Sequence, residues 1–533
     1  MRTRRTRWTI WVPRPRGTQV TGWASNTLAT RTSTTQQVTR GTELWPRWLF
    51  LRAVGLVFAS AFISLAVQIQ GLTGSQGILP ARNLLESVAA VLPVPARCFE
   101  LPTLLWLWQS DAALTALCIL GTLCSVLLIL NLFPRLAVIA CTLLFLSFVS
   151  AARDFSGYQS DGMLLEAGFL AAFLAPAGMR PGLAEDRPVS FAALWLLRWE
   201  WFRIYFESGV VKILSGDAQW RGLTALDHYY ENLPLPSFAG YWVQQLLPHS
   251  IHAATCALVL GLELAAPLAL FVSRRARAAL FVITTPFQFL IIATANYGFL
   301  NCIVLALGLL LLDDTTCARA GFRVPVHPPL ATPGSPLSRA IRRGGLFAAA
   351  LFLLATIEIF PGVPTRSLPA FLTLPARLLA PFRVANRYGL FAVMTTARYE
   401  IEFQGSRDGK EWIPYPFRWK PQALDEAPRF FVPHQPRFDW NLWFASLGDP
   451  RSYPWVFEAE ARLLLGSAPV LHLFAGDPFR GEPPSHLRAM LWKYRFTTLA
   501  EHRASGDYWR RELIGPYGPG LVRASDGTIE IQH

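Results

Sequence analysis

The stretch WEWFRIYFESGVVKILSGDAQWRGLTALDHYYENLPLP (199–236) begins inside an apolar run, yet it carries Glu200, Arg203, Glu207 and Lys212. A charged side chain at the centre of a bilayer costs about 2.5–3.5 kcal/mol on insertion scales. A helix that keeps four such groups is therefore expected to pair them or to use them. The stretch then continues as a segment dense in polar and aromatic side chains.

Composition places the chain among polytopic membrane proteins. Of its 533 residues, 52% are hydrophobic and only 16% are charged, whereas soluble domains carry about 25% charged residues. Apolar runs long enough for membrane helices occur at 49–68, 112–131, 133–151, 163–177, 191–213, 252–272, 278–295, 298–312 and 345–361. We predict a polytopic α-helical membrane bundle of about nine spans, with eight to ten compatible, followed by a soluble α+β or β-rich C-terminal domain.

The arginines predict how the chain crosses the membrane. Residues 1–44 form a basic, Thr-rich segment whose composition is typical of a disordered cytoplasmic tail. With that tail in the cytoplasm, the positive-inside rule holds. The arginines on the cytoplasmic side are then Arg135, Arg180, Arg187, Arg274, Arg275, Arg277, Arg319, Arg323, Arg339, Arg342 and Arg343. Residues 45–362 are expected to be the transmembrane domain, with a cytoplasmic linker at 313–344, and 363–533 an extracytoplasmic domain.

Several kinds of site are not expected. The seven cysteines lie mostly in apolar runs, and there is no CxxC and no Cys/His cluster at zinc spacing. Phosphate-binding, nucleophile-elbow and zinc-protease motifs are also missing from the sequence. We therefore expect no metal and no cofactor. Only Lys212, Lys410, Lys420 and Lys493 among the basic residues are lysines, so the net charge of +14 says little about nucleic acid. The expected partner is the lipid bilayer and not nucleic acid.

The C-terminal part predicts its own secondary structure. RYEIEFQGSRDGKEWIPYPFRW (398–419) alternates apolar and polar side chains on both sides of a turn at 406–409, which predicts a β-hairpin. Residues 454–474 have helical periodicity, whereas 486–496 and 507–517 resemble strands.

Two carboxylates mark the start of the fourth predicted span, in YQSDGMLLEAGFLAAFLAP (158–176). Ser160 or Asp161 could be a helix N-cap, and Asp161 could equally belong to a site at the outer mouth. Glu166 lies about one turn further inside. An intramembrane carboxylate is expected to face a partner or a cavity.

The fifth predicted span carries a polar seam. Glu200, Arg203 and Glu207 share one helical face, and Arg203 with Glu207 makes an i,i+4 ion pair that would lock helix packing. Lys212 lies off that seam near the outer end of the helix. It could extend its ammonium group to the headgroups, or a desolvated Lys212 with a lowered pKa could act as a base.

The segment after this span is expected to be an external loop, and it crowds chemically diverse side chains at the outer face. They are Asp217, Trp220, Arg221, Thr224, Asp227, His228, Tyr229 and Glu231. Aromatic residues at this depth are common in membrane proteins, but this mixture is denser than an aromatic belt requires. Asn296 and Asn301 flank another short outer turn and could cap its helices. All these groups converge on the outer end of the bundle.

Several of these motifs together resemble the lipase maturation factor family. The resemblance rests on 158–176, SGDAQWRGLTALDHYYENLPLP (215–236), ANYGFLN (295–301) with LLDD (311–314), NRYGLFAVMTTARYEIEFQGSRDGKEW (386–412), PHQPRFDWNLWFASLG (433–448), DPF (477–479) and RAMLWKYRFT (488–497). It covers roughly 45–520 and implies a cytoplasmic N-terminus and a lumenal or outer C-terminal domain. Animal members lie in the endoplasmic reticulum membrane and help secreted lipases fold and assemble.

Two further features bear on the setting of this chain. Heavy use of Arg and Ala with almost no Lys is typical of a GC-rich bacterial genome, so we expect a bacterial inner membrane, where the client need not be a lipase. The membrane half also resembles, more distantly, the vitamin K-dependent carboxylase-like superfamily. That resemblance rests on a Gly-x-x-Lys pattern at 209–212 and implies a catalytic base at Lys212 only.

Two hypotheses follow. In the first, the chain is a membrane-anchored folding or assembly factor, and 214–250 with PHQPRFDWNLWF (433–444) presents anchors to an exported client. Arg437, Trp440, Trp443 and Phe444 suit that role, because interface hot spots favour Trp, Tyr and Arg, although both tryptophans could instead form the core of their own domain. In the second, a membrane enzyme acts on a lipid or quinone-like substrate. Its base would be Lys212, assisted by Glu166, Glu207 or His228.

Overall fold

The structure is a computed structural model that describes residues 43–183, 189–323, 336–363 and 368–532. The predicted basic tail lies almost wholly outside the described residues, as does Arg187. Of the range predicted as a linker, residues 314–319 form helix α16 (Asp314–Arg319), and α17 (Pro336–Glu358) begins before the range ends.

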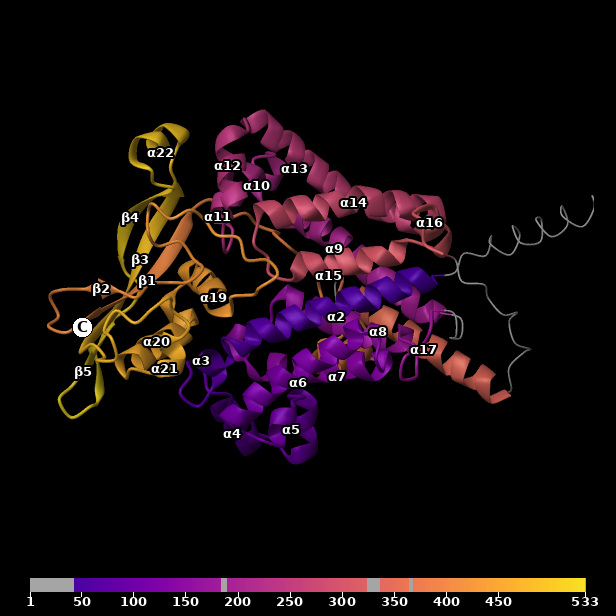
Figure 1. Cartoon of the computed structure of the whole chain (residues 1–533), viewed down its shortest axis with the longest axis horizontal. Coiled ribbons are helices and arrows are strands. Elements are labelled where there is room, and N and C mark those ends of the chain that lie inside the picture. Colours follow the sequence, from indigo (N-terminus) through magenta and orange to yellow (C-terminus); the bar gives the residue numbers. More distant parts are fainter. Residues whose placement is uncertain (1–42, 184–188, 324–335, 364–367, 533) are drawn as a thin grey trace, which may run out of the picture. The chain divides into compact units, whose positions relative to one another are not determined.

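Each of the nine predicted apolar runs contains a helix of the bundle (Figure 1). These are α2 (Leu44–Ala66), α6 (Asp111–Ile129), α7 (Pro134–Ala151), α8 (Gln159–Leu174), α9 (Phe191–Leu214), α13 (His249–Leu264), α14 (Arg274–Thr294), α15 (Leu300–Gly308) and α17. Within the described residues, 5 segments are long and apolar enough to cross a membrane: α2, α6, α7, α13 with the turn that follows it, and α14. The count of nine spans stays a prediction.

Short helices connect the long ones. They include α3 (Ile69–Thr73), α4 (Ala81–Val91), α5 (Val94–Glu100), α10 (Ala218–Arg221), α11 (Ala225–Asn232), α12 (Phe238–Leu246) and α18 (Ala370–Leu379). The outer segment after α9 was expected as a loop, and the structure corrects this. Asp217 caps α10 by accepting from the backbone N–H groups of Gln219 and Trp220 at 2.9 and 3.1 Å. A side-chain acceptor at the N-cap stabilises even a short helix.

Glycine allows the bundle helices to approach closely. A side chain at Gly121 of α6 would collide with the ring of Phe62 in α2, and one at Gly168 of α8 would collide with Thr142 in α7. Lipid tails are as apolar as the helix surfaces, so packing between membrane helices depends on such close contact. These small residues place α2, α6, α7 and α8 side by side.

The C-terminal part forms a mixed α and β domain. Strand β1 (Arg398–Ser406) pairs antiparallel with β3 (His486–Phe496), and β3 also pairs with β4 (Trp509–Pro516). The remaining strands are β2 (Ile413–Pro414), β5 (Gly520–Arg523) and β6 (Ile529–Gln532), in the order β2-β1-β3-β5-β6. The predicted hairpin, the helix within 454–474 and the two strands are confirmed.

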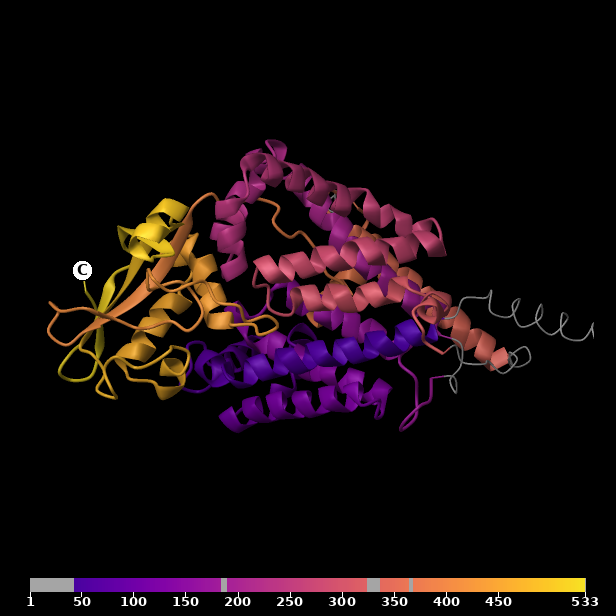
Figure 2. The ribbon, with the colours of Figure 1, turned by 45° about the horizontal axis from the view of Figure 1, so that its top comes forward.

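Helices cover one face of this sheet. They are α19 (Arg437–Ser446), α20 (Trp455–Leu464) and α21 (Ala468–Leu471), whereas α22 (Leu499–Ser505) lies in the connection between β3 and β4. Alternate sheet residues such as Ile401, Phe403 and Leu487 are fully buried. Figures 1 and 2 show the sheet and these helices together at one end of the bundle, with α16 at the other. One apolar core continues from α2 through to β5.

Candidate functional site

An irregular segment runs between the bundle and the C-terminal domain. Residues 386–394 (NRYGLFAVM) form neither helix nor strand, and we call this segment the strap. Buried N–H and C=O groups outside regular structure need partners. The charged and polar side chains of α8 and α9 supply the partners.

The first half of the strap is held by three charged residues of the bundle. Glu166 of α8 pairs with Arg203 of α9 and accepts from the Asn386 N–H at 3.1 Å and from the Tyr388 hydroxyl at 2.8 Å. Glu207 accepts from the Tyr388 N–H at 2.7 Å. Arg203 also donates to the Asn386 carbonyl at 2.6 Å. These charges therefore complete the hydrogen bonds of a non-helical chain.

The second half of the strap is held by the end of α9 and the start of α10. Lys212 donates to the Leu390 carbonyl at 2.9 Å, and the Trp220 indole donates to the Phe391 carbonyl at 2.8 Å. Ser215 donates to the Ala392 carbonyl at 2.7 Å. Asp217 accepts from the Met394 N–H at 3.3 Å. Four of the five strap residues in 390–394 thus form a backbone hydrogen bond with a side chain from 212–220.

Lys212 does not extend to the headgroups, which corrects one of its two predicted readings. Its side chain is 2% exposed and lies 2.8 Å from a carboxylate oxygen of Glu263 in α13. Its ammonium also lies 5.1 Å from the centre of the Trp220 ring. Glu263 and the strap carbonyl enclose the ammonium, so the group is neutralised inside the bundle.

The polar seam of α9 is confirmed only in part. Arg203 lies 3.7 Å from Glu207, as the i,i+4 spacing predicts. Glu200 is fully buried, but it has no ion-pair partner among the residues that the structure describes. Arg203 instead takes Glu166 from the neighbouring helix. Sequence spacing identified the partner on the same helix and could not identify the partner across it.

Arg437 and Asp161 form a second buried connection. The guanidinium donates to both carboxylate oxygens at 2.8 and 2.7 Å and to the Phe155 carbonyl at 2.8 Å. Both side chains are buried. The predicted N-cap at Ser160 or Asp161 is wrong, because α8 begins after Tyr158 and Asp161 lies within its first turn. Paired, two-bond geometry of this kind is the strongest form of an Arg–carboxylate contact.

A third set of contacts holds the segment before α19. Gln68, the N-cap residue of α3, accepts from the Arg437 N–H at 2.8 Å and donates to the Gln435 carbonyl at 2.9 Å. Asn296 donates to the Arg429 and Pro236 carbonyls at 2.7 and 3.1 Å. Asn301 donates to Gln288 at 2.7 Å. The two asparagines therefore connect different segments of the chain. The prediction that they cap the helices beside their turn is wrong.

The predicted outer cluster is divided between buried and exposed residues. Trp220 is buried, whereas Arg221 is exposed. Tyr229 accepts from the Tyr297 hydroxyl at 2.9 Å, and Glu231 accepts from the Phe496 N–H at 2.8 Å. The remaining members are partly exposed: Asp217, Thr224, Asp227 and His228. Much of this cluster therefore packs inward against the C-terminal domain.

Trp440 and Trp443 are buried, as the core alternative predicted, and Trp440 belongs to the apolar core that both domains share. Each is 8% exposed, so neither ring presents itself to solvent. Trp440 packs edge-on against Tyr158 of the bundle, with ring centres 6.0 Å apart. Both line a cavity of about 530 Å³ between the bundle, the strap and α19. They belong to the domain junction and not to the core of the C-terminal domain alone.

The proposed catalytic groups are not brought together. Lys212 pairs with Glu263, and Glu166 and Glu207 pair with Arg203. Among the described residues, no hydrogen bond or ion pair joins Lys212 to any of the three proposed assistants. The other cavity, of about 1060 Å³, is lined by apolar residues of α8, α9, α17 and α18 and does not include them either. The geometry gives the enzyme hypothesis no support.

Some important residues were missed at the sequence level. Glu263 is the one acid in its apolar run, a signal that could have revealed it. Asn386 and Tyr388 gave no such signal, because polar residues are ordinary before a soluble domain. Arg398 was also missed; it pairs with Glu400 and donates to the Glu231 carbonyl at 3.0 Å.

The domain families match both halves of this arrangement. The lipase maturation factor transmembrane domain matches residues 45–319, and the lipase maturation factor C-terminal domain matches residues 384–519. The chain belongs to the lipase maturation factor family. The second match begins just before the strap, so within this family the strap forms part of the C-terminal module.

Curated members of the lipase maturation factor family align along most of the chain. Lipase maturation factor 2 of Homo sapiens is 32% identical over 91% of this chain and 84% of its own length. Lipase maturation factor 2 of Gallus gallus is 31% identical over 91% and 82%. Lipase maturation factor 1 of Bos taurus is 31% identical over 91% and 90%. No solved structure matches the chain.

Proposed function

We propose that this chain is a membrane-anchored maturation factor that assists the folding or assembly of exported proteins, with lipases as the first candidate clients. The named relatives are lipase maturation factors that align along both domains. One structural observation carries the proposal. The strap and the Arg437–Asp161 pair join the two domains into one body, as expected of a holder and not of a catalyst with free acid and base groups.

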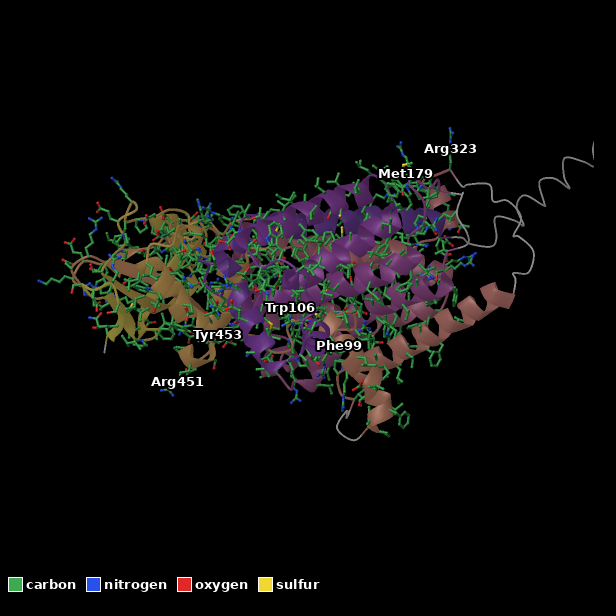
Figure 3. The ribbon with its side chains drawn as sticks, turned by 90° about the horizontal axis from the view of Figure 1, so that it is seen from below. Phe99, Trp106, Met179, Arg323, Arg451 and Tyr453 are labelled. Carbon is green, nitrogen blue, oxygen red and sulfur yellow. The ribbon has the colours of Figure 1, made fainter. Side chains whose placement is uncertain are left out.

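The proposed topology follows from the arginines. The N-terminus lies in the cytoplasm, nine helices cross the membrane, and the C-terminal domain lies outside a bacterial inner membrane. Arg323, labelled in Figure 3 at the end of the bundle away from the C-terminal domain, supports this, as do Arg135, Arg274 and Arg319 near the ends of α7, α14 and α16. Positive residues favour the cytoplasmic side.

Client contacts are assigned to exposed side chains near the junction. Phe444 of α19 is 39% exposed and Val393 of the strap is 64% exposed. Arg221 is exposed in the outer segment that follows α9. The buried residues predicted as anchors, among them Trp220 and Arg437, instead hold this surface in place.

The proposal is tested by co-expression. A secreted lipase is produced in a bacterial strain lacking any homologue, with and without this chain, and activity is measured per unit of secreted lipase protein. We expect higher specific activity and crosslinking of the lipase to the chain. Equal specific activity in both strains, for several lipases, would count against the function.

Any variant of this chain that is compared with the wild type in the co-expression experiment must remain folded. Deleting 214–250 is unsuitable, because Leu233, Leu235 and Tyr241 in this range are almost fully buried. Single substitutions at exposed positions are the appropriate perturbation, since surface changes rarely alter stability by more than about 0.5 kcal/mol.

A further inference from the structure

The cavity of about 530 Å³ at the domain junction has walls from several parts of the chain. The start of α8 contributes Tyr158 and Gln159, and the strap contributes Leu390 to Val393. Helix α19 contributes Trp440, Asn441, Trp443 and Phe444. Tyr453, labelled in Figure 3, also lines it where the C-terminal domain meets the bundle. Ligand cavities are common at such domain junctions and typically measure about 300–1,000 Å³.

Aromatic side chains dominate the lining of this cavity. Tyr158, Phe391, Trp440, Trp443 and Phe444 all contribute. Such rings offer a large contact area at a low cost in side-chain entropy. They are also the residue types that carry most binding energy in protein interfaces. The lining therefore suits apolar or aromatic groups of a ligand.

The charge of the cavity lining favours a polypeptide over a phospholipid as the occupant. The single charged residue of the lining is the exposed Asp154; no arginine or lysine contributes to it. Headgroup phosphates are held by basic side chains, and Arg437 nearby is already consumed by Asp161. An anionic lipid headgroup would thus meet repulsion without a compensating cation.

Two hydrogen-bond donors at this cavity lack acceptors. The indole N–H groups of Trp440 and Trp443 are buried and have no partner among the described residues. Buried polar groups without partners are rare in folded proteins and call for an explanation. An extended polypeptide carries a row of backbone carbonyls, which are the acceptors that these two rings need.

We propose that this junction cavity binds an extended apolar or aromatic segment of an exported client protein. The inference rests on the proposed maturation function and names the surface through which it acts. It identifies the ligand by chemistry: side chains that fit among aromatic rings, and backbone carbonyls that accept from the two indoles.

The test compares two matched positions of α19 and its C-cap. Phe444 and Leu447 are each 39% exposed, and only Phe444 lines the cavity. Phe444→Asp places a charge at the cavity, and Leu447→Asp places the same charge outside it. A third variant, Val393→Trp, fills the mouth from an exposed position. All three leave the buried ion pairs intact.

Binding is measured on the full-length protein in detergent by fluorescence anisotropy. The probe is a fluorescein-labelled Gly-Ser-Phe-Leu-Trp-Phe-Gly-Ser peptide, and the control probe replaces its apolar residues with serine. We expect the apolar probe alone to bind, with an affinity at least about tenfold weaker for Phe444→Asp and Val393→Trp but unchanged for Leu447→Asp. Equal binding by the wild type and Phe444→Asp would overturn the proposal.

Further outcomes distinguish a failure of the cavity assignment from a failure of the proposed maturation function. Displacement of the peptide by short-chain phosphatidylcholine would assign the cavity to lipid and overturn the proposal. If the wild type raises lipase activity and Phe444→Asp does so equally, the cavity assignment fails while the maturation function stands. Peptide binding that depends on Phe444, without any effect of the wild type on lipases, would support the cavity and refute the lipase function.

Discussion

At the residue scale, the charges inside the bundle have a structural explanation. A buried ion pair gains little over an apolar pair, but breaking it by removing one partner costs about 3–5 kcal/mol. Arg203, Lys212 and Arg437 each hold a carboxylate and at least one backbone carbonyl. Their worth therefore lies in fixing one arrangement of the chain.

Removing one partner of the Arg437–Asp161 pair should destabilise the whole protein. Asp161→Asn leaves the guanidinium of Arg437 buried without a compensating charge, so we expect a loss of about 3–5 kcal/mol. The check is thermal unfolding in detergent, followed by tryptophan fluorescence.

A matched control for this prediction uses an exposed ion pair. Arg510 lies 2.9 Å from Glu501, with both side chains about half exposed. Arg510→Gln should change stability by less than about 1 kcal/mol. An equally small effect of Asp161→Asn would contradict a stabilising role for the junction pair.

His434, which stacks beside Trp419, should make stability depend on pH. Burial lowers the pKa of His434 from 6.5 to about 4. The unfolded chain therefore binds a proton between about pH 6.5 and 4 that the folded chain does not, so the free energy of unfolding falls as the pH is lowered through this window. His434→Gln should remove that contribution.

The measurement for His434 is the difference between the two proteins at each pH. This difference cancels other groups, including Asp439, whose pKa is raised by burial to about 6. Parallel stability curves for wild type and His434→Gln from pH 7 to 4 would refute the prediction.

At the element scale, the strap explains why α9 is so polar. A regular helix satisfies its own backbone, whereas the strap relies on side chains of α8, α9 and α10 for partners. Because buried backbone outside regular structure needs hydrogen-bond partners, polar side chains of α9 are needed beside the strap. The four charges of α9 that first suggested chemistry are thereby mostly accounted for.

Lys212 and Glu263 provide the test of that explanation between α9 and α13. Lys212→Met leaves the carboxylate of Glu263 buried and unpaired and should cost about 3–5 kcal/mol. The double variant Lys212→Met with Glu263→Leu removes both charges and should recover most of this loss. Thermal unfolding of the four proteins of the cycle measures it.

The same double variant distinguishes structure from catalysis. If the role of Lys212 is structural, the double variant, whose stability is restored, should raise the specific activity of a co-expressed lipase as the wild type does. A catalytic base has no substitute in methionine, so a stable but inactive double variant would revive the enzyme hypothesis.

At the scale of the whole molecule, the bundle and the C-terminal domain share one core and are not independently packed domains. Arg398 of β1 donates to the Glu231 and Pro234 carbonyls at 3.0 and 3.1 Å, and Gln68 at the start of α3 accepts from the backbone N–H of Arg437, the first residue of α19. The C-terminal domain is therefore held firmly against the helices of the bundle.

The proposed topology can be read by cysteine labelling. Ser452→Cys lies on an exposed turn of the C-terminal domain, and Ala320→Cys is exposed beside α16. In a background with the exposed Cys98 replaced by serine, a membrane-impermeant maleimide should label Ser452→Cys in spheroplasts. Ala320→Cys should be labelled only after the membrane is opened, and labelling of both in intact spheroplasts would exclude this topology.

Local patterns in the sequence were sufficient for some of these features. The apolar runs, the hairpin around 406–409 and the Arg203–Glu207 pair follow from spacing, because helix and strand periodicities are properties of neighbouring residues. The membrane bundle, the mixed C-terminal domain and the family could all be inferred from such patterns and motifs.

Only the tertiary structure decided what the charges do. Lys212 meets Glu263 across 51 positions, and Arg437 meets Asp161 across 276. No local period links residues so far apart, and Lys212 had two open readings until packing enclosed it. The physical reason is that an ion's role depends on which group neutralises it, and that group is chosen by how the helices, the strap and α19 pack together.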